Sequence, residues 1–307
     1  MPLQDNTIKL ELQRRLNLWK ELKARGGPDG ISPQLVKQLG IHRGQQGVFR
    51  EPKVTSLVSG NPAGIAVGVL HTGQTYADDL SEDGVTYHYP KTKRKGRDQP
   101  EIEGMKACGE LGLPLFVVIT PFENSPGRNV RLGWVQRYSD EIGQLYITFS
   151  DTEQPPLPLI AGEDSTPFIL QAQRTFRHTK AKVRPNQGWF RFNALLQYGV
   201  GCAVCDIRQE SLLDAAHICS VEHGGSDDPR NALVFCLTHH RAFDQGLFGI
   251  DPATLRIEVR SPCQSPLELA ITRESIGHLR KHPHREALQW AWVGRAPKEQ
   301  KLKKQKR

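Results

Sequence analysis

Residues 202–244 read CAVCDIRQESLLDAAHICSVEHGGSDDPRNALVFCLTHHRAFD, and two kinds of site are interleaved in this stretch. Cys202 and Cys205 form a C-x2-C pair, and Cys236 and His239 form a C-x2-H pair further along. Two short knuckles of this spacing bring four soft ligands to one ion and complete a tetrahedral zinc site. The spacing therefore predicts a structural Zn²⁺ ion that closes the stretch into a compact frame.

Three further residues of the stretch, His217, Asn231 and His240, are not needed for that zinc. Their order inside a cysteine frame resembles the HNH nuclease family. The phrases DAAHI, DPRNALVFC and HRAFDQGLF resemble the branch of that family found in bacterial restriction enzymes. The resemblance implies a ββα-metal fold, in which a β-hairpin and a helix surround one catalytic metal ion.

The resemblance also implies a role for each residue. His217 would be the general base on the first hairpin strand, and Asn231 would fix the loop and orient that histidine. His240 would hold a divalent ion, Mg²⁺ or Mn²⁺, which stabilises charge on the phosphate and the leaving oxygen. Asp244 follows His240 by four residues. On a helix the two side chains share one face, so they can hold one ion together.

One position departs from the family pattern. Many HNH enzymes carry an acidic residue or a histidine directly before the base, as a metal ligand, and this chain has Ala216 there. Asp214 lies two residues back, on the same side of a strand, and would compensate as a ligand. The alternative is an ion held by His240 and Asp244 alone, with water and phosphate oxygens completing the shell, which suits a hard cation.

The bulk properties bound the class of protein. The chain has 307 residues, enough for two domains, and 37% hydrophobic residues, which suits a globular protein. Neither a membrane-spanning run nor a signal peptide is apparent. The net charge of +8 favours a polyanionic partner. Three of the six cysteines remain outside the zinc set, and this odd remainder favours a reducing, cytoplasmic location.

The N-terminal part, residues 1–40, reads as a helical segment. TIKLELQRRLNLWKELKAR, residues 7–25, places its apolar side chains on one stripe and ends at Gly26-Gly27-Pro28. A second short helix is expected over 33–39. The stripe would pack on its own domain, or alternatively form a dimer contact.

Residues 41–150 have a β-rich texture. The runs GIAVGVL, LPLFVVI, RLGWVQRY and QLYITFS are short, apolar and bounded by turn residues, and one helix, roughly 100–111, interrupts them. This pattern predicts a curved sheet or small barrel. With the metal-bound hairpin downstream, the fold class of the chain is α+β.

Residues 71–90 read HTGQTYADDLSEDGVTYHYP. Together with GRDQPEIEGMKACGELGLPLFVVI they resemble the SRA (YDG) domain, a PUA-like fold that flips a modified cytosine out of duplex DNA. The resemblance makes Tyr76 and Tyr89 the rings that stack the flipped base, with Tyr87 as the alternative to Tyr89. Asp79 would read the cytosine amino group. Large flat rings recover the few kcal/mol that flipping costs. Otherwise these tyrosines are ordinary barrel aromatics.

Basic residues lie next to this stretch. The run KTKRKGR, residues 91–97, is ordinarily a solvated loop, but beside a flipping pocket it is well placed to hold phosphates. In IHRGQQGVF, the residues His42, Arg43 and Gln45 are candidates for a loop that fills the hole left in the duplex. The predicted DNA-binding residues are Arg43, Lys93, Arg94, Lys95 and Arg97.

The remaining boundaries follow composition. Residues 151–182 begin Pro-rich and acidic and read as a linker, 183–295 form the HNH nuclease domain, and 296–307 are a basic, disordered tail. A reader and a nuclease on one chain predict a modification-dependent restriction endonuclease. It would bind double-stranded DNA carrying 5-methylcytosine or a related base and defend against modified phage DNA. One metal site per chain favours a homodimer or sequential nicking.

Two other interpretations compete with this one. A nuclease whose N-terminal domain reads another DNA feature would carry the same zinc-framed stretch. A noncatalytic DNA-binding protein with a zinc fold would explain the cysteines, but it would not require His217, Asn231 and His240 in this order.

Overall fold

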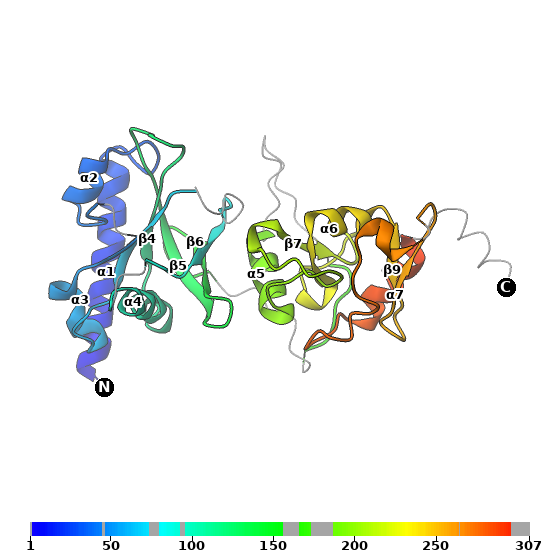
Figure 1. Cartoon of the computed structure of the whole chain (residues 1–307). Helices are drawn as coiled ribbons and strands as arrows, with labels where there is room; N and C mark the ends of the chain where they lie inside the picture. The colour runs from blue at the N-terminus through cyan, green and yellow to red at the C-terminus, as the bar shows by residue number, and fades with distance from the viewer. Residues whose placement is uncertain are drawn as a thin grey trace. The chain divides into compact units, whose positions relative to one another are not determined.

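The computed structural model describes residues 2–44, 47–73, 80–92, 96–155, 166–172, 187–263 and 265–295. Its internal contacts divide the chain into two compact units, which Figure 1 shows in the colours of the chain order. Unit 1 comprises Met1–Leu157 with Val183–Gly188, and unit 2 comprises Pro158–Lys182 with Trp189–Arg307. Within the described residues, none of the helices has the length and apolar character needed to cross a membrane.

Unit 1 is built on one six-stranded sheet. Its strands are β1 (Val48–Arg50), β2 (Ala66–His71), β3 (Gly84–His88), β4 (Leu115–Ile119), β5 (Asn129–Ser139) and β6 (Gln144–Phe149). Their spatial order is β1-β2-β4-β5-β6-β3, and only the β2–β4 pair is parallel. Each of the four apolar runs singled out in the sequence contributes one strand, so the β-rich prediction is confirmed here.

Four helices accompany the sheet. They are α1 (Pro2–Ala24), α2 (Pro33–Gln38), α3 (Pro52–Ser59) and α4 (Asp98–Glu110). The prediction that a single helix interrupts the strands is wrong, because α3 precedes α4. Its sequence, PKVTSLVS, is short and rich in β-branched residues, which weakens its helical signal. Proline in its first turn and Gly60 in the left-handed conformation at its end mark it as a helix after the fact.

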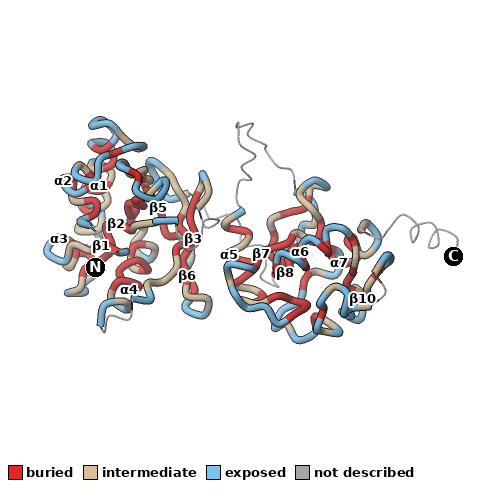
Figure 2. The backbone as a smooth tube through the Cα atoms, turned by 45° about the horizontal axis from the view of Figure 1, so that its top comes forward, coloured by how far each residue is buried: buried red, intermediate tan, exposed pale blue. Residues whose placement is uncertain are grey.

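The central strand β4 explains how the core is divided. Its residues Leu115 and Val117 face the cluster that contains Met105 of α4. The alternate residue Phe116 faces a second cluster, which contains Trp19 of α1. Because both faces of the strand are covered, it reads as a continuous apolar run rather than an alternating one. Figure 2 shows most of strands β2 and β3 of the same sheet as buried.

The sheet curls into a half-barrel. The β3 strand lies at one edge of the sheet and β1 at the other. The Tyr87 hydroxyl of β3 nevertheless donates to the carbonyl oxygens of Gly47, just before β1, at 3.1 Å and of Leu70, on β2, at 3.4 Å. The two edges are therefore brought within the reach of one side chain. The predicted fold class, α+β with a curved sheet, is confirmed.

Unit 2 carries the zinc-framed stretch. Its helices and strands are α5 (Gln187–Tyr198), β7 (Leu213–His217), β8 (Ala232–Cys236), α6 (Leu237–Asp244), β9 (Phe248–Ile250), β10 (Ile257–Val259) and α7 (Arg285–Gly294). Short 3-10 turns connect them at Glu210–Leu212, Val221–His223, Pro229–Asn231 and Pro266–Leu269. The β7 and β8 strands pair antiparallel and α6 follows β8 directly, which is the hairpin and helix that the sequence predicts.

A buried arginine of α1, paired with a glutamate one turn earlier, ties the helix to the rest of unit 1. Arg15 is fully buried and its Nε donates to Glu11 Oε1 at 2.7 Å, while its Nη1 donates to the Pro114 carbonyl oxygen at 2.6 Å. Burial favours a raised pKa for Glu11, but the hydrogen bonds and charges of Arg14 and Arg15 outweigh it and lower that pKa. The apolar side of the helix packs in the same unit, with Trp19 and Leu22 in the core. The helix therefore serves its own unit, as the first of the two interpretations predicts.

We expect Glu11→Ala to lower the free energy of unfolding by about 3–5 kcal/mol, because Arg15 would stay buried with its charge unpaired. Urea unfolding of the full chain, followed by circular dichroism, measures the loss. Glu21→Ala is the matched control, since Glu21 pairs with Arg25 at an exposed position on the same helix. Its cost should stay below about 1 kcal/mol. Equal losses in the two variants would contradict the anchoring role.

Candidate active site

The predicted zinc ligands come together in unit 2. The ligand atoms of Cys202, Cys205, Cys236 and His239 all lie within 4.8 Å of one another, and all four residues are buried. Cys236 Sγ is 3.0 Å from His239 Nδ1, and the other ring nitrogen, Nε2, lies 2.8 Å from the Leu269 carbonyl oxygen. Three thiols and an imidazole whose second nitrogen is held by a carbonyl are a suitable donor set for structural Zn²⁺. The cluster fits the ion that the spacing predicts.

The zinc cluster lies at the junction of strand and helix. Cys236 is the last residue of β8 and the N-cap of α6, so His239 lies in the first turn of that helix. The first knuckle is tied to the same strand, because Ala203 N donates to the Val234 carbonyl oxygen at 2.8 Å. The chain continues from His239 directly to His240. A zinc ion at this site would therefore fix the position of the backbone at His240.

His217 ends β7 and is held on two sides. Its ring stacks on Phe190 of α5, with centroids 3.6 Å apart and planes 8° from parallel. Its Nε2 lies 3.0 Å from Asp227 Oδ1. The stacking fixes the plane of the imidazole. The carboxylate selects one of the two ring orientations, related by a flip about the Cβ–Cγ bond, that keep this plane. The sequence did not predict the role of Asp227. The loop GGSDDP contains two adjacent aspartates, and nothing in the sequence indicates which side chain either of them contacts.

Asn231 is fully buried and holds the loop between the two strands. Its Oδ1 accepts from Cys219 N at 2.8 Å, and its Nδ2 donates to the carbonyl oxygens of Cys219 at 3.1 Å and Ser226 at 2.9 Å. All three contacts are to backbone. The side chain therefore works as a brace for the loop that leaves β7 and returns to β8.

His240 lies between two carboxylates. Its Nδ1 is 2.8 Å from Asp214 Oδ2, and its Nε2 is 3.4 Å from Asp244 Oδ2. Burial lowers the pKa of His240, but the hydrogen bond and charge of Asp214, with the charge of Asp244, raise it above its ordinary value. Likewise, burial raises the pKa of Asp214, and the contact with His240 outweighs that and lowers it.

The two carboxylates have different geometry toward a cation. Asp244 faces the same ring nitrogen, Nε2, that a cation held by His240 would use. Asp214 contacts the other ring nitrogen, Nδ1. Carboxylates that orient a metal-binding histidine contact the nitrogen that does not bind the metal. Ala216 is fully buried. The geometry favours the pair His240 and Asp244 as ligands, with Asp214 as the orienting group; direct ligation by Asp214 stays a prediction.

Arg295, at the C-terminal end of α7, contacts both the backbone at His217 and the side chain of Asp244. Its Nη1 donates to Asp244 Oδ1, and its Nη2 donates to the carbonyl oxygens of His217 at 2.8 Å and Ile218 at 3.1 Å. The guanidinium also lies over the Phe243 ring, 4.5 Å from its centroid. Sequence reasoning missed this residue, because it lies far along the chain from the motif and one arginine near a basic tail carries no distinctive signal.

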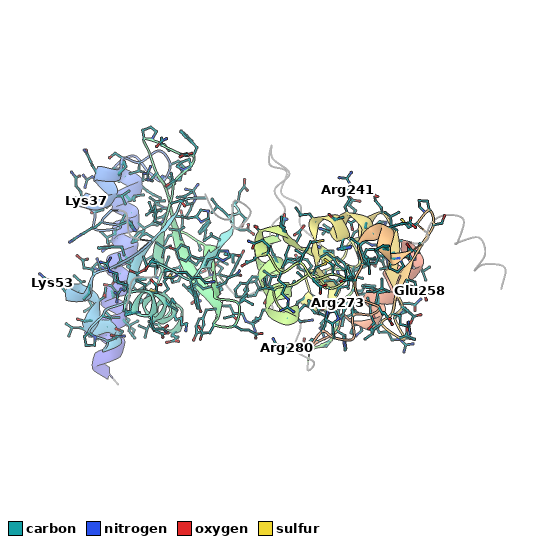
Figure 3. The ribbon with its side chains drawn as sticks, viewed as in Figure 1. Lys37, Lys53, Arg241, Glu258, Arg273 and Arg280 are labelled. Carbon is teal, nitrogen blue, oxygen red and sulfur yellow. The ribbon has the colours of Figure 1, made fainter. Side chains whose placement is uncertain are left out.

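The region is open to solvent along α6. A hollow beside this helix is lined by residues that include His240, Arg241 and Asp244. Arg241 is exposed and projects outward from α6 (Figure 3). A cation beside a metal-binding pair is a suitable contact for a DNA phosphate. The His240 and Asp244 side chains are therefore accessible from solvent.

The predicted base pocket is described only in part, since Tyr76 and Asp79 lie outside the described residues. The Tyr89 hydroxyl donates to Asp140 at 3.0 Å, and the Lys106 ammonium lies 5.7 Å from its ring centroid. Burial first, and then the Asp140 carboxylate, raise the pKa of Tyr89.

Tyr87, the alternative to Tyr89 as a base-stacking residue, has a different environment. It belongs to the core of unit 1, and its hydroxyl is held by backbone carbonyls. Its ring packs among core side chains and supports the curl of the sheet. Tyr87 is therefore a poor substitute for Tyr89 as a base-stacking residue.

The predicted phosphate-binding residues are also described in part. Those outside the described residues are Lys93, Arg94 and Lys95. Arg97 is exposed and directly precedes α4. Arg43 is more than half exposed, pairs with Glu51 at 2.9 Å and lies over the Phe49 ring. Arg43 would have to leave this pairing, or share it, to contact DNA.

Comparison with known proteins gives a family match and two weak structural likenesses. The family described as HNH endonuclease matches residues 202–251. No curated protein matches the chain. A solved structure titled modification dependent TagI restriction endonuclease is 20% identical, with a TM-score of 0.34, over 89% of this chain and 94% of that one. KRYPTONITE, in complex with mCHG DNA and SAH, is 16% identical with a TM-score of 0.31, over 43% of this chain and 33% of that one.

The zinc cluster makes a direct prediction. We expect the purified chain to carry one tightly bound zinc ion, and Cys236→Ser to lose it and to unfold unit 2 at a lower temperature, because metal binding contributes to folding. Metal analysis and thermal unfolding measure the two effects. Cys263→Ser is the control, since Cys263 lies outside the cluster. Retention of zinc by Cys236→Ser would show that the ligand set is misassigned.

Proposed function

We propose that this chain, whose residues 202–251 are an HNH endonuclease domain, is a modification-dependent DNA endonuclease. Unit 2 hydrolyses DNA phosphodiesters, and unit 1 reads 5-methylcytosine or a related modified cytosine. The observation that carries the hydrolytic part is the Arg295 guanidinium, which contacts the backbone of His217 and the carboxylate of Asp244 at once. One side chain thus ties the proposed base to the proposed metal pair.

The residues divide the work of hydrolysis. His217 acts as the general base and takes the proton of the water that attacks the scissile phosphate. Asn231 keeps the loop behind that histidine in place through its three backbone contacts. His240 and Asp244 would hold the divalent ion, and Asp214 would orient the His240 ring. A bound Mg²⁺ or Mn²⁺ would supply positive charge at the phosphate and the leaving oxygen.

The reading of the modified base is assigned to unit 1. Tyr76 and Tyr89 would stack the flipped cytosine and Asp79 would bond its amino group. The partly buried position of Tyr89 at the end of β3, on the rim of the curled sheet, supports this assignment. The basic run of residues 91–97, with Arg43, would hold the neighbouring phosphates. The net charge of +8 favours such a polyanionic partner.

The described part of each chain contains one proposed catalytic metal pair, which bears on assembly. Hydrolysis of both strands then requires two chains, as in a homodimer, or two successive nicks by one.

An enzyme that cuts only modified DNA leaves unmodified host DNA intact. We therefore place the protein in defence against modified foreign DNA, such as that of phages.

A cleavage panel tests the whole proposal. Duplexes of one sequence that carry cytosine, 5-methylcytosine, 5-hydroxymethylcytosine or its glucosylated form are incubated with the chain and Mg²⁺ or Mn²⁺. We expect cleavage of at least one modified duplex and little of the unmodified one. Equal binding and equal cleavage of all four duplexes would remove the reading role, while the nuclease role would survive.

A single substitution tests the hydrolytic centre. His217→Ala should lower the rate of cleavage by about 100-fold or more, the usual contribution of a general base, and should leave DNA binding unchanged. Rates under single-turnover conditions, with affinity from a gel-shift titration, separate the two. His278→Ala, which changes an exposed histidine outside the site, serves as the control. Full activity in His217→Ala would mean that another group is the base.

A further inference from the structure

The contact between His217 and Asp227 restricts the protonation of the ring. His217 Nε2 lies 3.0 Å from Asp227 Oδ1. An ionised carboxylate can only accept a hydrogen bond, so Nε2 must be the nitrogen that carries the proton. In the neutral ring this leaves the lone pair on Nδ1. The structure thus couples the choice of tautomer to a residue outside the His, Asn, His order.

The ring cannot easily escape that contact. Phe190, itself buried in α5, stacks on the imidazole with planes 8° from parallel. Rotation of the ring out of this plane would lose the stacking. A half-turn about the Cβ–Cγ bond would keep that plane but would put Cε1 in the place of Nε2 and break the hydrogen bond to Asp227. The stacked ring and the carboxylate together define one orientation of His217.

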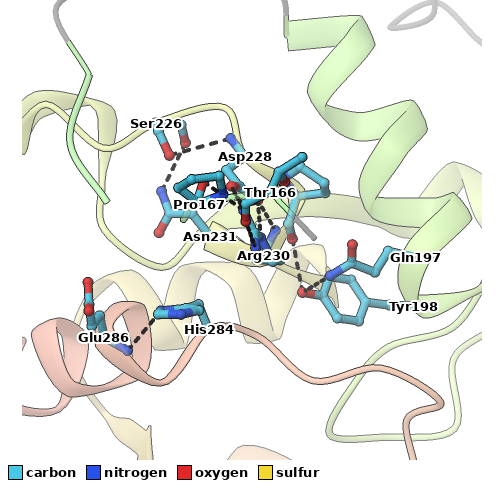
Figure 4. A network of polar contacts seen from close by, with 11 residues as sticks. Thr166, Pro167, Gln197, Tyr198, Ser226, Asp228, Arg230, Asn231, His284 and Glu286 are labelled. Atoms are coloured by element: carbon cyan, nitrogen blue, oxygen red, sulfur yellow. Dashed lines mark hydrogen bonds and ion pairs between the residues drawn. The ribbon is translucent and has the colours of Figure 1, made fainter. Parts of the chain in front are cut away.

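Asp227 is carried on a loop that is braced on both of its sides. Before it, the Ser226 carbonyl accepts from Asn231 at 2.9 Å. After it, the buried carboxylate of Asp228 accepts from Arg230 at 2.8 Å. Arg230 also donates to the Thr166 carbonyl oxygen at 2.9 Å (Figure 4). Two braces on adjacent residues leave the backbone of Asp227 little freedom.

A glycine allows this loop to lie close to the end of β7. A Cβ atom at Gly225 would stand 1.8 Å from the Cys219 carbonyl oxygen, which is far inside any allowed contact. The backbone nitrogen of Gly225 donates to the Ser220 carbonyl oxygen at 3.0 Å. Only glycine lets the loop return so near the strand that it has just left. That close return brings Asp227 back to His217.

From this geometry we propose that Asp227 is a positioning residue that fixes the tautomer of His217, so that Nδ1 is the ring nitrogen able to take the proton of the attacking water. Asp227 acts on the reaction through the imidazole. The inference rests on the proposed function for the role of His217, but the tautomer itself does not. This gives Asn231 a further role, since it braces the loop that carries the carboxylate.

Nuclear magnetic resonance of the full, zinc-loaded chain labelled with ¹⁵N-histidine tests the tautomer without any reaction. Two-bond and three-bond ¹H–¹⁵N correlations separate a protonated Nε2 from a protonated Nδ1, and the His217 signals are those lost in His217→Gln. We expect the neutral ring to carry its proton on Nε2 in the unaltered chain and to become a mixture of tautomers in Asp227→Ala. A proton on Nδ1 in the unaltered chain would overturn the proposal, whatever the variants do.

Kinetics on the cleaved duplex tests the consequence. Asp227→Asn should lower kcat by about 100-fold or more while KM for DNA changes by about twofold at most, because the base is misdirected and the DNA contacts are untouched. Glu222→Gln, an exposed acid on the same loop, should change neither. An unchanged kcat in Asp227→Asn would overturn the proposal. If the tautomer is as expected but no duplex is cut by the unaltered chain, the proposed function fails and only the control of the His217 tautomer by Asp227 stands.

Discussion

The zinc cluster is the constraint on which unit 2 depends. It joins a knuckle near the start of the motif to the junction of β8 and α6, so that strand and helix cannot move apart. His240 follows the last zinc ligand directly, and the strand that carries His217 pairs with the strand that ends at Cys236. A structural ion held by this cluster would therefore constrain the separation of His217 and His240.

A shared pattern emerges around these two histidines. Each has a carboxylate on one ring nitrogen, Asp227 on Nε2 of His217 and Asp214 on Nδ1 of His240. In both cases the contact with the acid helps to define how the ring is turned. The carboxylates come from different segments, a braced loop and the strand β7. Orientation in this site is thus supplied by residues that are not the reactive groups.

Local pattern made part of this structure predictable. Paired knuckles, apolar runs and the four-residue spacing of His240 and Asp244 depend on neighbours in sequence, and the structure contains the zinc cluster, the strands and the shared helix face. Asp227 and Arg295 were not predictable, because their partners are chosen by a loop path and by the packing of α7. Helix α3 was missed because eight residues with several β-branched side chains give little periodicity.

The position of Arg295 has a practical meaning for anyone who trims or fuses this protein. The family match ends at residue 251, yet the guanidinium that grips both halves of the site comes from the end of α7. An expression fragment that ends at residue 251 would lack this arginine. A fragment that keeps these contacts must extend through Arg295.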